Sequence, residues 1–252
     1  MELRVIGCSG SVSGPEGPAS CYLVRHGGFD LLLDLGPGGF GGLWNLEPRT
    51  VDAIALSHLH PDHCLDLCAF NVAATFSPTA PWPRIPVYAP ANAPERMSRA
   101  YEPSTGSGSD ETDWWCDFIP WAAEQRIGPF TVRTIPARHS TEAYSIRLEA
   151  GGRSLVYTGD TGPNPELIEL ARGADLLLAE AAFQHADDLP ADVHLSARQA
   201  AEHARAAGAD TLVLTHIPPW YSCEEAYAEA RPHFDGSLEL ARTGAVLSVG
   251  EH

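Results

Sequence analysis

Basic side chains are scarce in this sequence. Its 252 residues carry 16 lysines and arginines against 33 aspartates and glutamates, which gives a formal net charge of -17. A surface of that average charge repels polyanions, so we expect no long nucleic acid among its partners. Apolar runs are also short: none reaches the roughly 18 residues of a membrane helix, and the charged N-terminal stretch lacks the apolar core of a signal peptide. We therefore expect no membrane partner.

Cysteine is too sparse and too scattered for a disulfide framework. Such frameworks occur in small secreted domains, where cysteines are concentrated. A reduced protein, and hence a cytoplasmic location, is the simpler expectation. The six residues are Cys8, Cys21, Cys64, Cys68, Cys116 and Cys223.

Short apolar runs bounded by glycine and proline recur along the whole chain and predict strands, for example at 51–57 and 211–219. Helices are predicted between them; at 196–208, Ser196 and Gln199 form a capping box and Gly208 a C-terminal stop. Two strand-rich halves, each with helices, predict an α/β fold: an αββα four-layer sandwich of two mixed β-sheets with outer helices. No disordered linker separates the halves, so we expect one domain over 1–252.

Tryptophan is concentrated after an acidic, polar stretch at 102–113. Three of the six tryptophans lie in 114–121. We interpret this segment as a hydrophobic anchor for a long loop, with a lid or a dimer surface as the alternative.

A dense group of metal-ligand types follows the predicted strand 51–57. His58, His60, Asp62 and His63 stand within six residues. One helix would scatter these side chains and one strand would split them between two faces, whereas a tight loop leaving a strand can turn all four inward. Four ligands exceed the need of one catalytic ion that also takes distant ligands, so the pattern indicates two adjacent ions.

Three further candidate ligands stand at predicted strand ends. His139 follows FTVRTIPAR, Asp160 ends RSLVYTGD and His216 follows TLVLT. Taken singly, each is an ordinary buried histidine or turn aspartate. Because all three fall where a strand meets a loop, we expect them to converge at one edge of the sheets.

In this order, the residues resemble the metallo-β-lactamase superfamily. HLHPDH matches its H-x-H-x-D-H signature, preceded by Asp34 in LLLDLG. The resemblance implies the fold of that superfamily and places Asp34 beside the site as a support, with a turn cap as the alternative. It also implies the ligand sets: His58, His60 and His139 for one ion; Asp62, His63 and His216 for the other; Asp160 as the bridge.

The residue at position 60 bears on the kind of metal. Relatives that use a di-iron pair for redox chemistry have glutamate there, whereas this chain has His60. The imidazole favours two divalent ions of zinc, a redox-silent Lewis acid, with manganese or iron as alternatives. Zinc makes hydroxide available near neutral pH, so hydrolysis is the expected chemistry.

Residues 180–219 resemble the branch that contains ribonuclease Z and atypical cyclic-nucleotide phosphodiesterases. Members carry a histidine just before the helix that leads to the last metal ligand, which here is His194 in VHLSARQAAEH. We interpret His194 as the proton donor to the leaving group, with a plain loop residue as the alternative. Asp62 is counted as a catalytic residue as well as a ligand.

Two features argue against processing of transfer RNA. Only 20 residues separate His139 from Asp160, where ribonuclease Z inserts a long RNA-binding arm, and the net charge is strongly negative. The expected activity is a phosphodiesterase on a small cyclic nucleotide of the 3′,5′-cyclic AMP type, with attack by a metal-bridging hydroxide. Ser9-Gly10-Ser11 would lie against the phosphate or the ligand loop, or form a plain turn.

Two rival functions remain open. A thioesterase or lactonase would use the same metal pair, with the Trp-rich segment 114–121 as an apolar acyl pocket. A non-catalytic metal-binding protein would keep the ions and show no turnover. The resemblance further implies a homodimer, for which 102–121 is the candidate contact.

Overall fold

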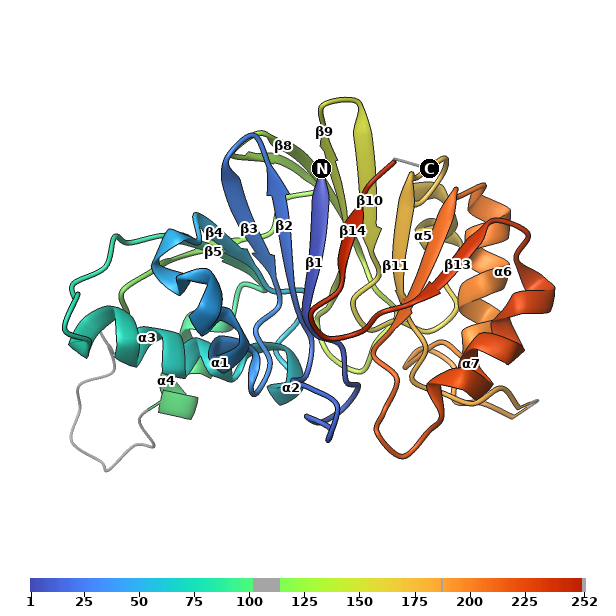
Figure 1. Cartoon of the computed structure of the whole chain (residues 1–252), viewed down its shortest axis with the longest axis horizontal. Helices are drawn as coiled ribbons and strands as arrows, with labels where there is room; N and C mark the ends of the chain where they lie inside the picture. The colour runs from blue at the N-terminus through green and yellow to red at the C-terminus, as the bar shows by residue number, and fades with distance from the viewer. Residues whose placement is uncertain (102–113, 187, 251–252) are drawn as a thin grey trace.

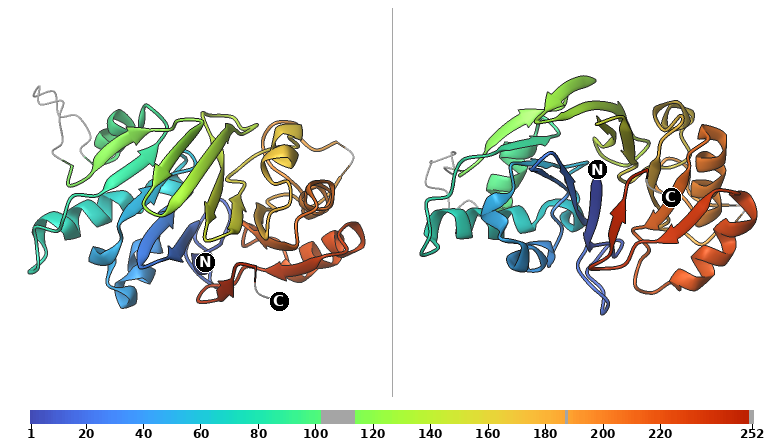
Figure 2. Two further views of the ribbon diagram at one scale, coloured as in Figure 1. Left: turned by 90° about the horizontal axis from the view of Figure 1, so that it is seen from above. Right: turned by 45° about the horizontal axis from the view of Figure 1, so that its top comes forward.

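The computed structural model describes residues 1–101, 114–186 and 188–250. Two seven-stranded sheets face each other, and helices cover the outer side of each sheet (Figures 1 and 2). Each sheet contains both parallel and antiparallel pairs. The αββα sandwich of two mixed sheets predicted from the sequence is therefore confirmed; the single domain stays a prediction.

The first sheet joins the two ends of the described chain, because β14 pairs with β1. Its strands run in the order β14 (Val246–Ser248), β1 (Glu2–Gly7), β2 (Cys21–His26), β3 (Phe29–Leu33), β4 (Ala53–Ala55), β5 (Pro86–Ala89) and β6 (Asp117–Pro120). From β3 to β6 the pairs are parallel, so the carboxyl ends of these strands meet at one edge.

The second sheet has its two fully buried strands beside one of its edge strands. Its order is β13 (Ser237–Leu240), β12 (Thr211–Thr215), β11 (Leu176–Glu180), β10 (Arg153–Tyr157), β9 (Tyr144–Ala150), β8 (Phe130–Pro136) and β7 (Glu124–Ile127). Every residue of β11 and β12 is buried, as expected for parallel strands covered on both faces.

The helices divide between the two outer layers (Figure 1). On the first sheet lie α1 (Gly39–Leu43), α2 (Pro61–Cys64), α3 (Asp66–Phe76) and α4 (Ala93–Tyr101); on the second lie α5 (Pro165–Leu170), α6 (Ala197–Ala207) and α7 (Cys223–Ala230). Short 3-10 turns occupy Trp44–Leu46, Pro48–Thr50 and Arg231–His233. No helix in the described ranges combines the length and apolar character needed to cross a membrane.

Three apolar clusters fill the spaces between the four layers. One lies between the sheets and includes Leu33 and Leu178, and the other two lie between each sheet and its helices. Trp114 and Trp115 belong to the cluster under the first helical layer: their exposed fractions are 5% and 6%, and Trp115 stacks on Phe70. The tryptophans thus anchor this segment, as predicted, whereas 102–113 lies outside the described residues.

Candidate metal centre

Loops and one short helix at a common edge of the two sheets carry the predicted ligands. His58 and His60 lie just beyond β4. The prediction of a plain loop was wrong for the next two ligands, because Asp62 and His63 lie on α2, which Figure 1 shows at the lower centre. Pro61 occupies the first position of this turn, where its missing N–H costs no helical hydrogen bond.

The second sheet brings the other ligand candidates to the same place. His139 lies beyond β8, Asp160 beyond β10 and His216 directly after β12. Two groups of side chains result, and within each the nearest ligand-type atoms all lie within 4.8 Å of one another. The groups are His58, His60, His139 and Asp160, and Asp62, His63, Asp160 and His216.

Asp160 belongs to both groups, and its two oxygens face different histidines. Oδ2 is 3.6 Å from Nε2 of His58, while Oδ1 is 3.3 Å from Nε2 of His63 and 3.6 Å from Nε2 of His216. A carboxylate placed in this way can bridge two adjacent ions. The structure thus brings all seven predicted ligands together, and their assignment as ligands is taken up as a proposal below.

Outer hydrogen bonds fix the orientation of three of the imidazoles. Nδ1 of His139 lies 2.8 Å from the carbonyl oxygen of Val193, and Nδ1 of His58 lies 3.0 Å from the Ser57 hydroxyl oxygen. Nδ1 of His63 likewise meets a carboxylate. With Nδ1–H donated outward, the Nε2 lone pair of each ring points into the cluster, as metal-binding histidines require.

The carboxylate that meets Nδ1 of His63 belongs to Asp34, which supports the cluster from outside the ligand groups. It is fully buried and accepts hydrogen bonds from Nδ1 of His63 at 2.7 Å, from the Tyr157 hydroxyl at 2.7 Å, and from the amide and hydroxyl of Ser57 at 2.6 and 2.8 Å. Its backbone is left-handed, with φ 55°, which is costly for a residue other than glycine. Of the two interpretations of Asp34, the structure bears out the support of the ligands, because the bonds of its carboxylate come from Ser57, His63 and Tyr157.

Tight backbone packing holds the loops against the ligands. A Cβ atom on Gly10 would overlap the carbonyl oxygen of His216, and one on Gly36 would overlap that of Asp62. The amide of Ser11 points at Nε2 of His216, 3.4 Å away. Of the three interpretations of Ser9-Gly10-Ser11, the structure therefore bears out contact with the ligand loop.

The donor set fits divalent ions. Nε2 of His58 and Oδ1 of Asp160 are buried without a hydrogen-bond partner among the described residues, and both face the cluster. Burial lowers the pKa of His58, so this ring is a neutral donor at neutral pH. Burial opposes ionisation of Asp160, but the surrounding histidines hold its pKa well below the usual range. Neutral imidazoles and ionised carboxylates are the forms that bind metal.

His194 stands beside both groups. Its ring centroid is 5.3 Å from that of His139 and 5.8 Å from that of His216. Its Nδ1 lies 3.1 Å from Oε1 of Glu180, which is fully buried, and 3.8 Å from Asp160. Burial opposes protonation, but the Glu180 carboxylate raises the pKa of His194 to about 9. The imidazole thus holds a proton at neutral pH and can donate one.

The sequence did not single out Ser57, Tyr157 or Glu180, and of these Glu180 contacts the proposed proton donor. Glu180 ends β11, and its carboxylate also accepts hydrogen bonds from the amides of Thr161 and Ala182. An acidic residue at the end of the apolar run LLLAE is a signal of a buried, paired carboxylate, because an unpaired one would be expensive. The same strand-end rule that found Asp160 would have found it.

Comparisons with known proteins agree with this fold. The family model described as "Beta-lactamase superfamily domain" matches residues 30–217. Ribonuclease Z of Haloarcula marismortui is 31% identical over 296 residues, covering 97% of this chain and 95% of that protein. The chain therefore belongs to the beta-lactamase superfamily, and its fold is the metallo-beta-lactamase fold. The predicted superfamily and the predicted resemblance to ribonuclease Z are confirmed.

Other relatives span nearly the whole chain. The uncharacterized protein Rv1339 of Mycobacterium tuberculosis is 40% identical over 243 residues, covering 94% of this chain and 88% of that one. The probable metallo-hydrolase YhfI of Bacillus subtilis is 29% identical over 250 residues, covering 98% of this chain and 99% of that one. The crystal structure of YhfI matches with a TM-score of 0.86 at 27% identity, over 98% of both chains.

Proposed function

We propose that this protein is a dinuclear-metal-dependent hydrolase, a phosphodiesterase that acts on a small cyclic nucleotide of the 3′,5′-cyclic AMP type. The observation that carries the proposal is the position of His194. It lies against residues of both ligand groups and is held by the buried carboxylate of Glu180. A metal-binding protein without catalytic activity would have no need of a protonated side chain beside its ligands.

The ligands are proposed as the sequence assigned them. His58, His60 and His139 would hold one ion, Asp62, His63 and His216 the other, and Asp160 would bridge them. Zinc is the proposed metal, since imidazole and carboxylate suit it. When bound, two such ions supply Lewis-acid chemistry: they acidify water near neutral pH and neutralise charge on a phosphoryl group.

The protein's own residues then have separable tasks. Asp34 and Ser57 keep the ligand rings turned inward, as their hydrogen bonds indicate. Asp62 and His216 would face the same ion, since Oδ2 of Asp62 lies 3.1 Å from Nε2 of His216. His194 donates its proton to the departing 3′ oxygen; Glu180 holds the ring in place, and its negative charge favours the return of a proton to the ring from solvent water.

Two features support a small phosphodiester over a long RNA. The interval between His139 and Asp160 holds only β9, β10 and the turn between them, which leaves no room for an RNA-binding arm. The net charge of -17 disfavours a polyanion. The name of one relative, ribonuclease Z, supports phosphodiester hydrolysis as the broader class of reaction. The name of another, probable metallo-hydrolase, supports metal-dependent hydrolysis.

The thioesterase alternative loses its specific support. It required the tryptophans of 114–121 to line an acyl pocket, but Trp114 and Trp115 are buried beneath the first helical layer. Trp121 is half-buried and donates its Nε1 hydrogen to the carbonyl oxygen of Leu56.

A substrate panel tests the proposal. Zinc-loaded protein is offered cyclic AMP, bis-nitrophenyl phosphate, a precursor transfer RNA, an acyl thioester and a lactone, and products are quantified by chromatography. Release of AMP as the fastest reaction is the expected result. Rapid thioester or lactone turnover without AMP release would contradict the phosphodiesterase, and RNA cleavage alone would contradict the small substrate.

Two further sequence predictions stay predictions. The homodimer is tested by light scattering on the eluting peak of a gel-filtration column. The proposed dimer contact loses part of its surface, because Trp114 and Trp115 are buried and 102–113 lies outside the described residues.

The predicted cytoplasmic location is tested by fractionation of the native cell.

A further inference from the structure

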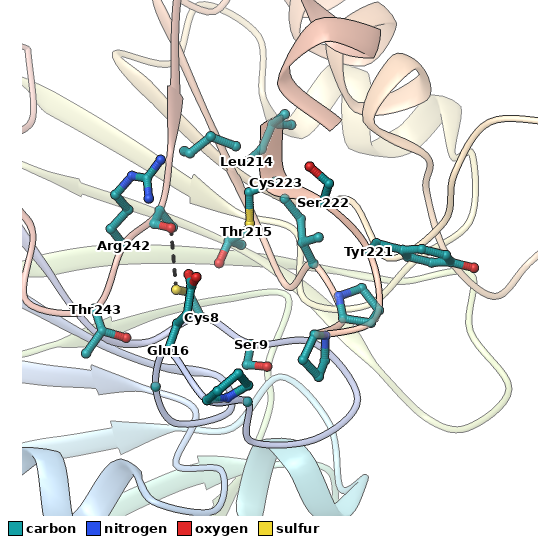
Figure 3. A pocket seen from close by; sticks show the side chains of 18 of the residues that line it. Cys8, Ser9, Glu16, Leu214, Thr215, Tyr221, Ser222, Cys223, Arg242 and Thr243 are labelled. Atoms are coloured by element: carbon teal, nitrogen blue, oxygen red, sulfur yellow. Dashed lines mark hydrogen bonds between the residues drawn. The ribbon is translucent and has the colours of Figure 1, made fainter. Parts of the chain in front are cut away.

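A pocket lies next to the proposed metal centre and is lined by none of its proposed ligands. The loop Cys8–Gly17, the segment after β12, the start of α7 and the turn after β13 enclose a cavity of about 360 Å³ (Figure 3). Thr215 and Ile217 line this cavity, whereas His216 between them does not. The peptide that carries His216 thus separates the pocket from the metal site.

Apolar side chains form one part of the pocket's lining, called the inner wall here, beside the hydroxyl groups of Ser9, Thr215 and Ser222 (Figure 3). Leu214, Ile217 and Pro218 line it together with two cysteines, Cys8 and Cys223, whose side chains Figure 3 shows. Burial raises the pKa of Cys8 to about 11, and burial also raises that of Cys223. Both thiols therefore stay protonated and act as small apolar groups. The volume is at the low end for ligand sites and suits on the order of ten non-hydrogen atoms.

The rim of the pocket carries an excess of negative charge. Glu16 and Glu224 face one arginine, Arg242, and that arginine lies 3.6 Å from Glu224. In the part of the chain that the structure describes, no hydrogen bond or ion pair occupies the carboxylate of Glu16. Glu16 lines the same pocket as Cys8 and Cys223 (Figure 3).

We propose that this pocket binds a small organic cation, with a compact apolar body against the inner wall and one ammonium group beside Glu16. An anion is disfavoured at this rim and in the field of the whole chain, whose net charge is -17. The pocket is therefore a poor second site for a phosphodiester. The proposal does not rest on the proposed function, since it uses none of the metal ligands.

Protection of Cys223 from alkylation tests the site. Zinc-loaded protein is treated with iodoacetamide in the presence of hexylamine, hexanol or hexanoate, and labelling of each cysteine is followed by peptide mass spectrometry. Cys68 on α3 is the internal reference, because it too is partly exposed and lies outside the pocket. Equilibrium dialysis of the same three probes measures binding directly, so a slow reaction at Cys223 does not hide it.

The expected result is selective protection. At ten times its dissociation constant, hexylamine should slow labelling of Cys223 about tenfold and leave Cys68 unchanged. Hexanol should bind more weakly and hexanoate weakest of the three. Absence of hexylamine binding in dialysis, equal slowing of both cysteines, or hexanoate as the tightest probe would overturn the proposal.

A charge variant tests the part played by Glu16. Glu16 is exposed, so Glu16→Gln should fold normally and lose the preference for hexylamine over hexanol. Glu47→Gln changes another exposed carboxylate, one that does not line the pocket, and is the matched control. This variant should keep the preference for hexylamine over hexanol. An unchanged preference in Glu16→Gln would show that the pocket does not select a cation in this way.

Discussion

At the scale of single residues, His194 and Asp160 have different tasks although they lie 3.8 Å apart. Replacing His194 by alanine removes the proposed proton donor and none of the proposed ligands. We expect kcat to fall by about 10²–10⁴-fold while the metal content per chain stays the same. His233→Ala, at a half-buried histidine whose described partner is Glu202, is the control and should change neither value. Metal loss in His194→Ala would mean that His194 is a ligand.

The carboxylate of Glu180 makes a pH-dependent prediction. Its negative charge raises the pKa of His194, so replacement by the neutral Glu180→Gln should lower that pKa. A proton donor with a lower pKa deprotonates at lower pH, and the alkaline limb of the pH–kcat profile should move toward neutrality. The measurement is the pH profile of both proteins at saturating substrate. A limb that stays in place, in a variant that melts at the parent temperature, would contradict the positioning role.

Four of the seven proposed ligands were predictable as a dense cluster after a predicted strand, and three as metal-binding residue types at strand ends; their division between two ions came from the resemblance to the superfamily. The hydrogen bonds behind them were harder to predict. Ser57, Tyr157 and Glu180 act through contacts between segments that are far apart in the sequence, such as Tyr157 with Asp34. Only the folded chain places these donors and acceptors together.

At the scale of elements, the N-terminal cap of α6 offers a stability test. Ser196 accepts from the amide of Gln199, and the Gln199 side chain returns a bond to the amide of Ser196. Ser196→Ala should therefore lower the free energy of unfolding by about 1 kcal/mol. Denaturant unfolding measures this change, with Ser237→Ala on the exposed side of β13 as a control expected within about 0.5 kcal/mol of the parent. Equal free energies of unfolding for Ser196→Ala and Ser237→Ala would show that the cap adds nothing to the stability of the fold.

The helix predicted at 196–208 has nearly correct bounds, Ala197–Ala207. The strand predicted at 211–219 ends at Thr215 in the structure, because the left-handed backbone of His216 stops it. The strand predicted at 51–57 is shorter in the structure, Ala53–Ala55, because the amide of Ser57 bonds Asp34 instead of a neighbouring strand. β14 has three residues and exists through pairing with β1 at the other end of the chain. α1 contains three glycines in five residues, so helix propensity argues against it and packing imposes it.

At the scale of the whole molecule, the proposed metal centre would join the two sheets. His58 to His63 follow a strand of the first sheet, while His139, Asp160 and His216 follow strands of the second. Ions bound there stabilise only the folded chain, by about 2.7 kcal/mol per site at a hundred times the dissociation constant. For a protein of this size, removal of metal should lower the melting temperature by about 5–10 °C per site.

Calorimetry before and after treatment with a chelator measures that shift. Restoring zinc should restore the parent melting temperature, which separates metal loss from damage by the chelator. Asp160→Asn is the matched variant: having lost the proposed bridge, it should show a smaller drop on chelation. Identical melting temperatures with and without metal in the parent would contradict a metal centre that links the sheets.

The central claim, a pair of ions serving hydrolysis of a cyclic nucleotide, is tested most directly by one titration. Metal-free protein receives zinc in steps while AMP release from cyclic AMP is recorded at each step. The account predicts that activity rises until two equivalents per chain are bound and then stays level. A plateau at one equivalent, or no AMP release at any zinc level, would contradict it.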